Sequence, residues 1–176
     1  MQNEVRFAGF GGQGILLIGK ILAQAAMIEG AHVAWIPSYG PEMRGGTAYC
    51  TVVISDTPIG SPIIRNPKHL VAMNKPSLEK FAPTIKSNGI ILINSSLIST
   101  GSGRNDVDEL KVPVVDIAKN LGNIKVANIV ALAAFIQRSG IVTQKLIEKC
   151  IQMEFENNTK LVNLNLKALS AGIAAV

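Results

Sequence analysis

Two glycine-rich segments near the start of this sequence carry the residues best placed to bind a ligand. The first reads Gly-Phe-Gly-Gly-Gln-Gly over residues 9–14, and the second reads Ser-Tyr-Gly-Pro-Glu-Met-Arg-Gly-Gly over residues 38–46. Glycine is favoured where the backbone takes a positive φ or must approach a ligand or a neighbouring chain closely. Both segments follow apolar runs that read as strands, so we expect both to open at the ligand-binding edge of an α/β sheet.

The first segment fits the G-x-G-x-x-G pattern of a strand-to-helix turn, whose free N–H groups at the helix N-terminus attract anions. A dinucleotide site also needs an acidic residue at the end of the second strand, to bind the ribose hydroxyls. That strand ends Ala-Trp-Ile-Pro-Ser at residues 34–38, and Glu29 comes before it. The pattern is therefore a poor match to a site for NAD or FAD, and a tight turn that needs glycine for packing alone is an alternative.

The second segment contains one carboxylate and one guanidinium, on Glu42 and Arg44, close to the phenol of Tyr39. In the simplest case the two charges pair with each other across a rigid surface turn. Long glycine-rich loops are costly to order, however, and they usually have a function or lie at an interface. Arg44 can bind a carboxylate or a phosphate through two parallel hydrogen bonds.

Few other residues could form a catalytic or metal-binding group. Cys50 and Cys150 lack the spacing of a metal or iron–sulfur site, and they read as buried thiols in a reducing compartment. His32 and His69 belong to no triad-like pattern, and the acidic residues at 106–109 are most simply a solvated patch. We therefore assign no catalytic residue and no metal ligand.

The composition indicates a folded chain with a covered surface and an anionic ligand or an acidic partner. Hydrophobic residues make up 48% of the sequence and charged residues only 16%, which excludes disorder. The net charge is +5, but the Lys and Arg residues are scattered, so nucleic acid is not expected. The sequence shows no targeting pattern and no apolar stretch that could cross a bilayer, so we expect a cytoplasmic protein with no membrane contact.

The hydrophobic pattern predicts an α/β fold in a single domain over residues 1–176: a mostly parallel, Rossmann-like sheet with an antiparallel hairpin and helices on both faces. Strand, glycine turn, helix and strand over residues 5–36 form a βαβ unit with parallel strands. Residues 47–55 and 59–64 form the hairpin, across a turn at residues 56–58. Further strands are expected at 69–73, 89–94 and 112–116, and further helices at 76–83, 126–138, 143–156 and 160–174.

The two glycine segments, at this spacing and before the predicted hairpin, resemble the gamma subunit, or gamma domain, of the 2-oxoacid:ferredoxin oxidoreductases. The hairpin contributes Ile54-Ser55-Asp56 and Ile59-Gly60-Ser61-Pro62 to this resemblance. The similarity covers essentially the whole chain and is strongest over residues 8–76. Residues 74–77, Asn-Lys-Pro-Ser, and residues 94–96, Asn-Ser-Ser, are most similar to the branch that acts on 2-oxoglutarate or branched-chain 2-oxoacids.

The resemblance implies a reaction that is shared among several subunits. A 2-oxoacid is oxidatively decarboxylated, coenzyme A accepts the acyl group, and the electrons pass to ferredoxin. Thiamine diphosphate and the iron–sulfur clusters are then expected on partner chains, which are the alpha, beta and ferredoxin-like subunits. This chain would brace the active-site subunits and help to position coenzyme A.

The resemblance also assigns roles to individual residues. The loop that contacts coenzyme A or a partner would consist of Gly11, Gly12, Gln13 and Gly14. The residues that face the active-site side of the assembly would be Tyr39, Glu42, Arg44, Gly45 and Gly46. Two other interpretations stay open: a free-standing Rossmann-like nucleotide-binding redox or regulatory protein, and a scaffold subunit that binds no ligand.

Overall fold

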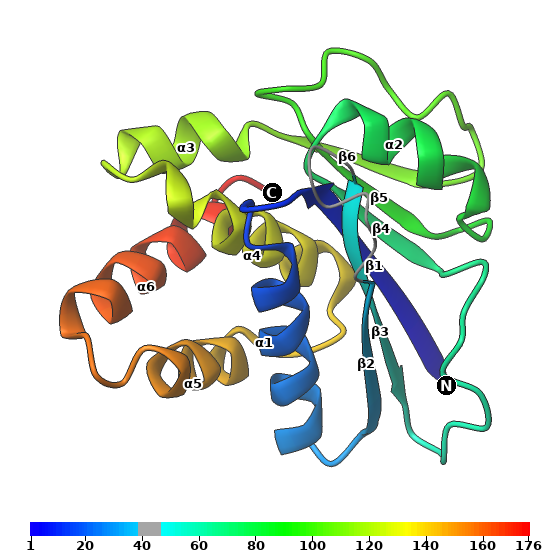
Figure 1. Ribbon diagram of the computed structural model, residues 1–176, viewed down its shortest axis with the longest axis horizontal. Coiled ribbons are helices and arrows are strands. Elements are labelled where there is room, and N and C mark those ends of the chain that lie inside the picture. Colours follow the sequence, from blue (N-terminus) through cyan, green and yellow to red (C-terminus); the bar gives the residue numbers. More distant parts are fainter. Residues whose placement is uncertain (39–46) are drawn as a thin grey trace.

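The computed structural model describes residues 1–38 and 47–176, which form a six-stranded sheet flanked by helices (Figure 1). The strands are β1 (Gln2–Phe10), β2 (His32–Ser38), β3 (Thr47–Ser55), β4 (His69–Ala72), β5 (Ile90–Asn94) and β6 (Asp108–Val112). The helices are α1 (Ile15–Ile28), α2 (Lys75–Phe81), α3 (Val114–Asn120), α4 (Ala127–Ser139), α5 (Gln144–Glu154) and α6 (Thr159–Ile173).

The strands lie in the order β2-β3-β1-β4-β5-β6. β1, β4, β5 and β6 pair in parallel, whereas β3 is antiparallel to both of its neighbours, β1 and β2. The carboxyl ends of the parallel strands therefore meet at one edge of the sheet, where α/β folds usually bind ligands. The predicted fold class is confirmed.

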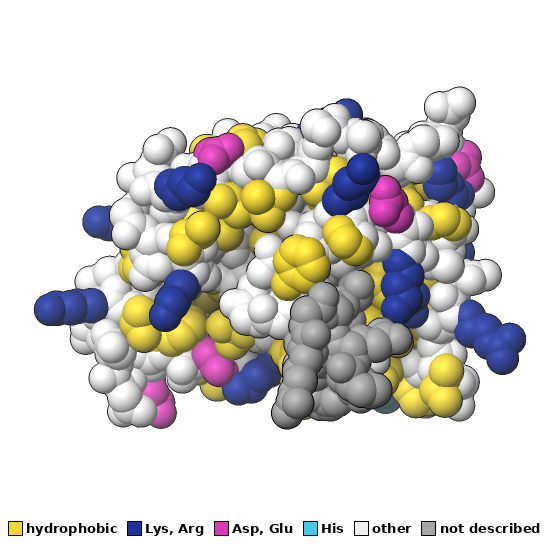
Figure 2. Space-filling view, turned by 45° about the horizontal axis from the view of Figure 1, so that its top comes forward, with side chains coloured by type: hydrophobic (Ala, Val, Ile, Leu, Met, Phe, Trp, Pro, Cys, Tyr) yellow, Lys and Arg dark blue, Asp and Glu magenta, His cyan; other side chains and the backbone are white. Residues whose placement is uncertain are grey.

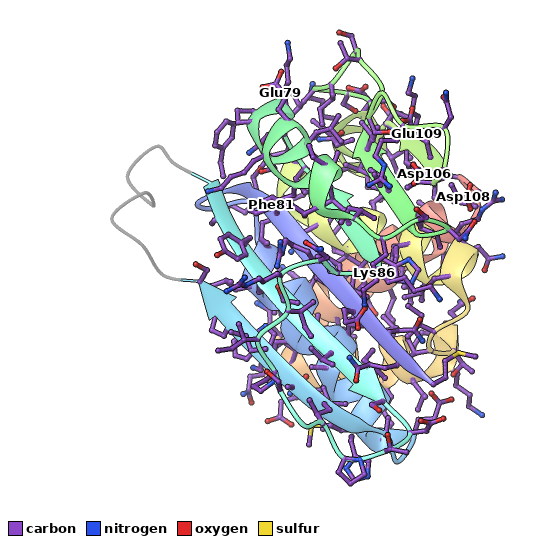
Figure 3. All side chains as sticks on the ribbon, turned by 90° about the vertical axis from the view of Figure 1, so that its right-hand side faces the viewer. Glu79, Phe81, Lys86, Asp106, Asp108 and Glu109 are labelled. Atoms are coloured by element: carbon purple, nitrogen blue, oxygen red, sulfur yellow. The ribbon has the colours of Figure 1, made fainter. Side chains whose placement is uncertain are left out.

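Helices cover both faces of the sheet, but unequally. α1, α3, α4, α5 and α6 lie on one face, where they enclose the larger hydrophobic core around Phe7, Leu92 and Phe135. α2 lies on the other face and packs a smaller core around Leu70 and Ile91. Beyond α2, the connection 56–68 passes over the strands on this second face, as Figure 3 shows.

The predicted position of the antiparallel hairpin is wrong. Residues 59–64 form no strand, and β3 pairs along its length with β1 on one side and β2 on the other. Both hydrogen-bonding edges of β3 are thus occupied, so no edge is left for a returning strand. The Ile64 carbonyl instead accepts a hydrogen bond of 2.8 Å from the Arg6 guanidinium.

The βαβ prediction is right about the relative direction of its two strands but wrong about their being neighbours in the sheet. β1 and β2 both run antiparallel to β3, so they point the same way, but β3 lies between them. β2 is consequently an edge strand, and it extends past the predicted end at residue 36, so that Pro37 lies within it opposite Cys50. An edge position tolerates proline because its missing N–H would face away from the sheet.

The last strand is also displaced from its predicted position. β6 covers Asp108–Val112, and residues Val114–Asn120 form helix α3 instead of continuing a strand. The hydrophobic pattern did not indicate this strand, because three of its five residues in Asp-Glu-Leu-Lys-Val are charged. Charged residues are tolerated there because β6 lies at the edge of the sheet. Pro113, which lacks an N–H, then ends the ladder and stands at the start of α3.

Candidate functional site

The first glycine segment forms a tight turn from the end of β1 into α1. Gly12 and Gly14 take φ values of +88° and +71°, and Gly14 is the residue that precedes the first turn of α1. The Gln13 side chain closes the turn, because its Oε1 accepts a hydrogen bond of 2.7 Å from the Phe10 N–H. The Gln13 N–H in turn donates to the Phe10 carbonyl at 3.2 Å. The turn is therefore held by its own residues.

The glycines of this turn are required for different reasons. A Cβ on Gly9 would lie 2.5 Å from Gln13 Oε1 and 3.0 Å from Met73 Cβ, and one on Gly14 would overlap the Asn128 amide. Among the described residues, a Cβ on Gly12 would meet nothing within 4 Å. Packing therefore explains the glycines at 9 and 14, whereas the backbone of Gly12 faces open space that a ligand can occupy.

Asn128 ties this turn to helix α4. Its Nδ2 donates to the Gly14 carbonyl at 3.2 Å, and its Oδ1 accepts from the Ile129 N–H at 2.8 Å. The side chain is buried, and it joins residues 114 positions apart in the sequence. The starts of α1 and α4 are thereby held together at the carboxyl edge of the sheet.

A cleft of about 220 Å³ opens beside the turn, at the carboxyl edge of the parallel strands. Gly12 and Gln13 line one side of the cleft. The remaining lining comes from Met73, Leu97, Val115, Ile124, Lys125 and Ala127. These residues follow β4, β5 and β6 in the chain or lie at the start of α4. Among the described residues, the cleft thus combines an apolar lining with one charged side chain, that of Lys125.

Exposed apolar side chains surround this edge. Phe10, Leu97 and Ile124 are 40%, 53% and 54% exposed. Figure 2 turns this edge towards the viewer and shows hydrophobic side chains exposed among Lys and Arg residues. A shallower hollow of about 270 Å³ adjoins the same turn and is lined by Phe10, Gly11, Gly12, Gly14, Ile15, Leu16, Leu17 and Ala48. An edge of this composition is typical of a surface that becomes covered by another molecule.

The second glycine segment lies outside the described residues. The predictions for Tyr39, Glu42, Arg44, Gly45 and Gly46 therefore stay predictions. Its two flanks are placed: β2 ends at Ser38 and β3 begins at Thr47.

The histidines and cysteines of the described chain are placed as structural residues. His69 is buried against the Phe135 ring, its Nδ1 accepts from the Ile90 N–H at 3.0 Å, and burial lowers its pKa to about 4. The buried Cys50 thiol contacts the Ile15 carbonyl, and burial raises its pKa to about 12, which makes a thiolate unavailable at neutral pH. Within residues 1–38 and 47–176, no three His, Cys, Asp or Glu side chains gather as a metal site would require.

The acidic residues at 106–109 are paired rather than merely solvated. They lie along and beside β6, as Figure 3 shows. Asp106 pairs with Arg104, which holds the pKa of that carboxyl well below its usual range, and Asp108 pairs with Arg138. Glu109 accepts two hydrogen bonds of 2.7 Å from Ser102. These contacts fasten the 95–107 connection and α4 to the sheet.

Sequence reasoning missed Lys125, which lines the cleft, and Asn128, which ties the glycine turn to α4. Lys125 and Asn128 lie more than 100 positions after the glycine turn. The one local signal was an amide, Asn128, at the start of the apolar part of its helix. It also missed Arg6, a buried cation whose guanidinium lies over the Tyr49 and Phe81 rings, with its central carbon 5.4 and 5.0 Å from their centroids.

Comparison with known proteins gives consistent matches. Residues 4–175 match the family model described as pyruvate ferredoxin/flavodoxin oxidoreductase. The chain is 42% identical to ketoisovalerate oxidoreductase subunit VorA of Methanothermobacter thermautotrophicus, over 96% of this chain and 35% of that protein. It is 38% identical to 2-oxoglutarate synthase subunit KorC of Methanocaldococcus jannaschii, over 98% of this chain and 92% of that protein. The chain thus spans about a third of the first relative and nearly all of the second.

Solved structures share the fold. The gamma subunit of a keto/oxoacid ferredoxin oxidoreductase from Geobacter sulfurreducens superposes with a TM-score of 0.86 at 31% identity, over 98% of this chain and 97% of that one. The 2-oxoglutarate:ferredoxin oxidoreductase of Magnetococcus marinus, solved with 2-oxoglutarate, coenzyme A and succinyl-CoA, gives 0.90 at 21% identity, over 99% of this chain and 31% of that one. In the part of the chain that the structure describes, no helix is both long and apolar enough to span a membrane.

Proposed function

Because this chain belongs to the pyruvate ferredoxin/flavodoxin oxidoreductase family, we propose that it is the gamma subunit of a multi-subunit 2-oxoacid:ferredoxin oxidoreductase. The observation that carries the proposal is the near end-to-end match to a separate gamma subunit, over 98% of this chain and 97% of that one. The complex converts a 2-oxoacid and coenzyme A to an acyl-CoA and carbon dioxide, and passes the electrons to ferredoxin. Cytoplasmic location follows from this role.

The substrate we propose is 2-oxoglutarate or a branched-chain 2-oxoacid. The similarity to a 2-oxoglutarate synthase subunit and to a ketoisovalerate oxidoreductase subunit supports this range. We propose that most of the contacts that choose between the two substrates belong to other subunits.

We place thiamine diphosphate and the iron–sulfur clusters on the partner subunits, namely alpha, beta and a ferredoxin-like chain. Iron–sulfur clusters are usually held by four cysteine thiolates. Cys50 and Cys150 do not suffice for this role, because the sequence holds only these two cysteines. When bound in the complex, the clusters supply the electron path to ferredoxin.

The chain's own contribution is to position coenzyme A and to brace the active site. The backbone of Gly11, Gly12 and Gly14 would present N–H groups at the N-terminus of α1, which favours a phosphate, while Gln13 holds the turn through its bonds to Phe10. No acidic residue occupies the first turn of α1, so nothing on this helix end opposes an anion. The exposed apolar edge would be buried by the thiamine-bearing subunits, with Tyr39, Glu42, Arg44, Gly45 and Gly46 facing the same side.

The topology argues against a free-standing dinucleotide-binding protein. In that fold the ribose-binding carboxylate comes from the end of the strand next to β1, on the same edge as the glycine turn. Here the strand next to β1 on that side is β3, which is antiparallel and ends at the opposite edge. β2 is one strand further away and ends Ile36-Pro37-Ser38, without a carboxylate.

Co-purification and reconstitution test the proposal. We expect the tagged chain, expressed in its source cells, to co-purify with thiamine-dependent and iron–sulfur subunits. The isolated chain should show no 2-oxoacid-dependent dye reduction, and adding it to the partner subunits should restore turnover. Turnover by the isolated chain, or a full rate from the partners without it, would contradict the proposal.

A further inference from the structure

The two edges of the sheet differ in how well they are protected against pairing with another chain. β6, at one edge, has three charged residues among its five, and contacts within the chain hold two of them, Asp108 and Glu109. β2, at the other edge, reads His-Val-Ala-Trp-Ile-Pro-Ser and contains no Asp, Glu, Lys or Arg. Charged side chains are a usual protection of an exposed edge strand, so an edge without them indicates a surface that another strand covers.

We propose that β2 pairs in antiparallel direction with the β2 of a second copy of this chain, so that the two sheets join into one. This inference goes beyond the proposed function and does not depend on it. Figure 3 shows β2, in light blue, as the outermost strand on its side of the sheet. Of the six described strands, only β3 pairs with β2, so the other edge of β2 is open to a second copy.

The register of the ladder determines which backbone groups β2 presents outward. The Asp56 N–H donates to the Met1 carbonyl at 3.3 Å, on the β1 side of β3, and N–H groups alternate between the two sides along a strand. The odd-numbered residues of β3 therefore bond to β2, where they lie opposite its even-numbered residues. This leaves the N–H and carbonyl groups of Val33 and Trp35 pointing outward, and within residues 1–38 and 47–176 no backbone group bonds to them.

A second copy of β2 matches these outward groups when Ala34 lies opposite Ala34 of the second copy. Val33 then lies opposite Trp35 of the second copy, and Trp35 lies opposite its Val33. Each of these two pairs can exchange both of its hydrogen bonds, because both residues present an N–H and a carbonyl to the other strand. The strand is thus its own complement about a two-fold axis at Ala34, as an interface between identical chains requires.

The ends of the free edge favour this register over its neighbours. The next pair outward would be Ala31 with Pro37, and neither has a free N–H, because Ala31 donates to the Ala26 carbonyl at 3.1 Å and proline has none. The ladder therefore ends at the same residues in both copies. A register centred on Trp35 would instead place Val33 opposite Pro37 and lose the hydrogen bond that proline cannot donate.

The side chains on the face that α1 covers suit this register. Trp35 lies against α1, where a Cβ on Gly19 would lie 3.0 Å from its Nε1, and it is still 36% exposed. Opposite Val33 of the second copy it would form an aromatic–β-branched pair, a combination that stabilises neighbouring strands. Burial of the remaining Trp35 surface would add a hydrophobic contribution to the backbone hydrogen bonds.

The side chains on the opposite face suit the same register. Ala34 and Ile36 share this face, because side chains alternate along a strand. Ile36 of the second copy would lie opposite His32, beside a hollow of about 320 Å³ that is lined by His32, Val33, Ala34, Pro58, Ile59 and Pro62. The two Ala34 side chains meet at the two-fold axis, where their small size permits the close approach of a pair without hydrogen bonds. Since β2 contains no Asp, Glu, Lys or Arg, self-pairing places no like charges opposite each other.

The mass of the full chain in solution, measured by sedimentation equilibrium over a series of concentrations, tests the pairing. We expect the unmodified chain to form a dimer. Ala34→Lys places two ammonium groups opposite each other and should weaken association about tenfold, equivalent to about 1.4 kcal/mol. The matched control is Asn157→Lys, which adds the same charge at an exposed position between α5 and α6 and should leave association unchanged. The mass of a single chain throughout the series, or equal association of the two lysine variants, overturns the inference.

Disulfide formation tests the register and identifies the occupant. Directly opposed residues of a pair without hydrogen bonds have Cα atoms about 4.5 Å apart, so Ala34→Cys places two thiols within disulfide distance. In Ile36→Cys, the matched control on the same face, the two thiols are offset by about 13 Å along the strands. Mild oxidation should therefore link two copies through Ala34→Cys and not through Ile36→Cys, and the native cysteines are buried. Linking through both positions or neither overturns the inference, as does a link from Ala34→Cys to a different subunit when the assembled complex is oxidised.

Discussion

At the residue scale, the glycine turn shows that neighbouring glycines of one motif need not have one purpose. Gly14 combines a positive φ with a position against Asn128, whereas Gly12 combines a positive φ with open space. At Gly14 the missing side chain allows α1 to pack against α4. At Gly12 it leaves the backbone accessible beside the cleft.

This difference predicts unequal effects of alanine at the two positions. Gly14→Ala should lower the free energy of unfolding by about 3 kcal/mol, because backbone strain adds to a clash with a buried amide. Gly12→Ala should cost only about 1 kcal/mol, from strain alone. Urea unfolding monitored by circular dichroism measures both. Equal losses for the two variants would show that the Asn128 contact does not constrain this turn.

His69 should make the stability of this chain depend on pH. Its folded-state pKa of about 4 lies below its ordinary value of 6.5, so the unfolded chain binds the proton first as the pH falls. The contribution of neutral His69 is therefore complete above about pH 6.5 and is lost progressively down to about pH 4, by about 3 kcal/mol in all. Unfolding free energies measured from pH 7.5 to 4 test this.

The matching variant is His69→Gln, which does not titrate and whose amide oxygen can still accept from Ile90 N–H. Its unfolding free energy should be lower at pH 7.5 but nearly flat between pH 6.5 and 4. An equally steep decline in the variant would assign the pH dependence to other groups.

At the element scale, the connection 56–68 takes the place of a strand over the face opposite α1. Arg6 anchors it, because the guanidinium donates to the Ile64 carbonyl at 2.8 Å and to Thr51 Oγ1 at 3.3 Å while it lies over two aromatic rings. Burial lowers the Arg6 pKa, which reflects the cost of keeping this cation out of water. Its hydrogen bonds and ring contacts offset that cost.

Arg6→Met should therefore loosen this connection more than it destabilises the sheet. Methionine fills the space between the rings but cannot donate to Ile64. We expect faster amide exchange across residues 60–68 and a loss of about 1–2 kcal/mol in unfolding free energy. Hydrogen exchange measured by mass spectrometry checks this, with β5 as the internal reference. Uniform acceleration across all strands would instead assign Arg6 to the stability of the whole sheet.

At the scale of the whole molecule, one edge carries the cleft, the exposed apolar side chains and both flanks of the second glycine segment. The opposite face and the β6 side are fastened by internal ion pairs such as Arg138–Asp108. We propose that the partners of this chain bind at the carboxyl edge, which the rest of the fold holds in place.

Arg44 should matter to the assembled enzyme and not to the stability of this chain. Arg44→Ala should leave the melting temperature of the isolated chain unchanged but lower assembly or turnover of the complex at least tenfold, equivalent to about 1.4 kcal/mol or more. Arg44→Lys should restore only part of this, because an ammonium group cannot form the planar two-bond contact. A lower melting temperature with normal assembly and turnover would make Arg44 a structural turn residue.

The sequence alone determined the features that depend on neighbouring residues. Apolar runs and helical periodicity identified β1, β4, β5 and the helices α1, α4, α5 and α6. The glycine spacing identified the turn at residues 9–14, and the resemblance of both glycine segments and of residues 54–62 indicated the family. That partner subunits hold the iron–sulfur clusters stays a proposal. The single-domain boundary and the roles of the second glycine segment stay predictions.

Only the tertiary structure decided which distant residues meet. A strand's own residues do not say which edge of it will be paired, so the position of β3 between β1 and β2, and the loss of the expected 59–64 strand, followed from long-range hydrogen bonding. For the same reason Lys125, which lines the cleft, and Asn128, which donates to the Gly14 carbonyl, could not be joined to the glycine turn from the sequence. They reach it because the parallel strands end at a common edge and the start of α4 packs against the start of α1.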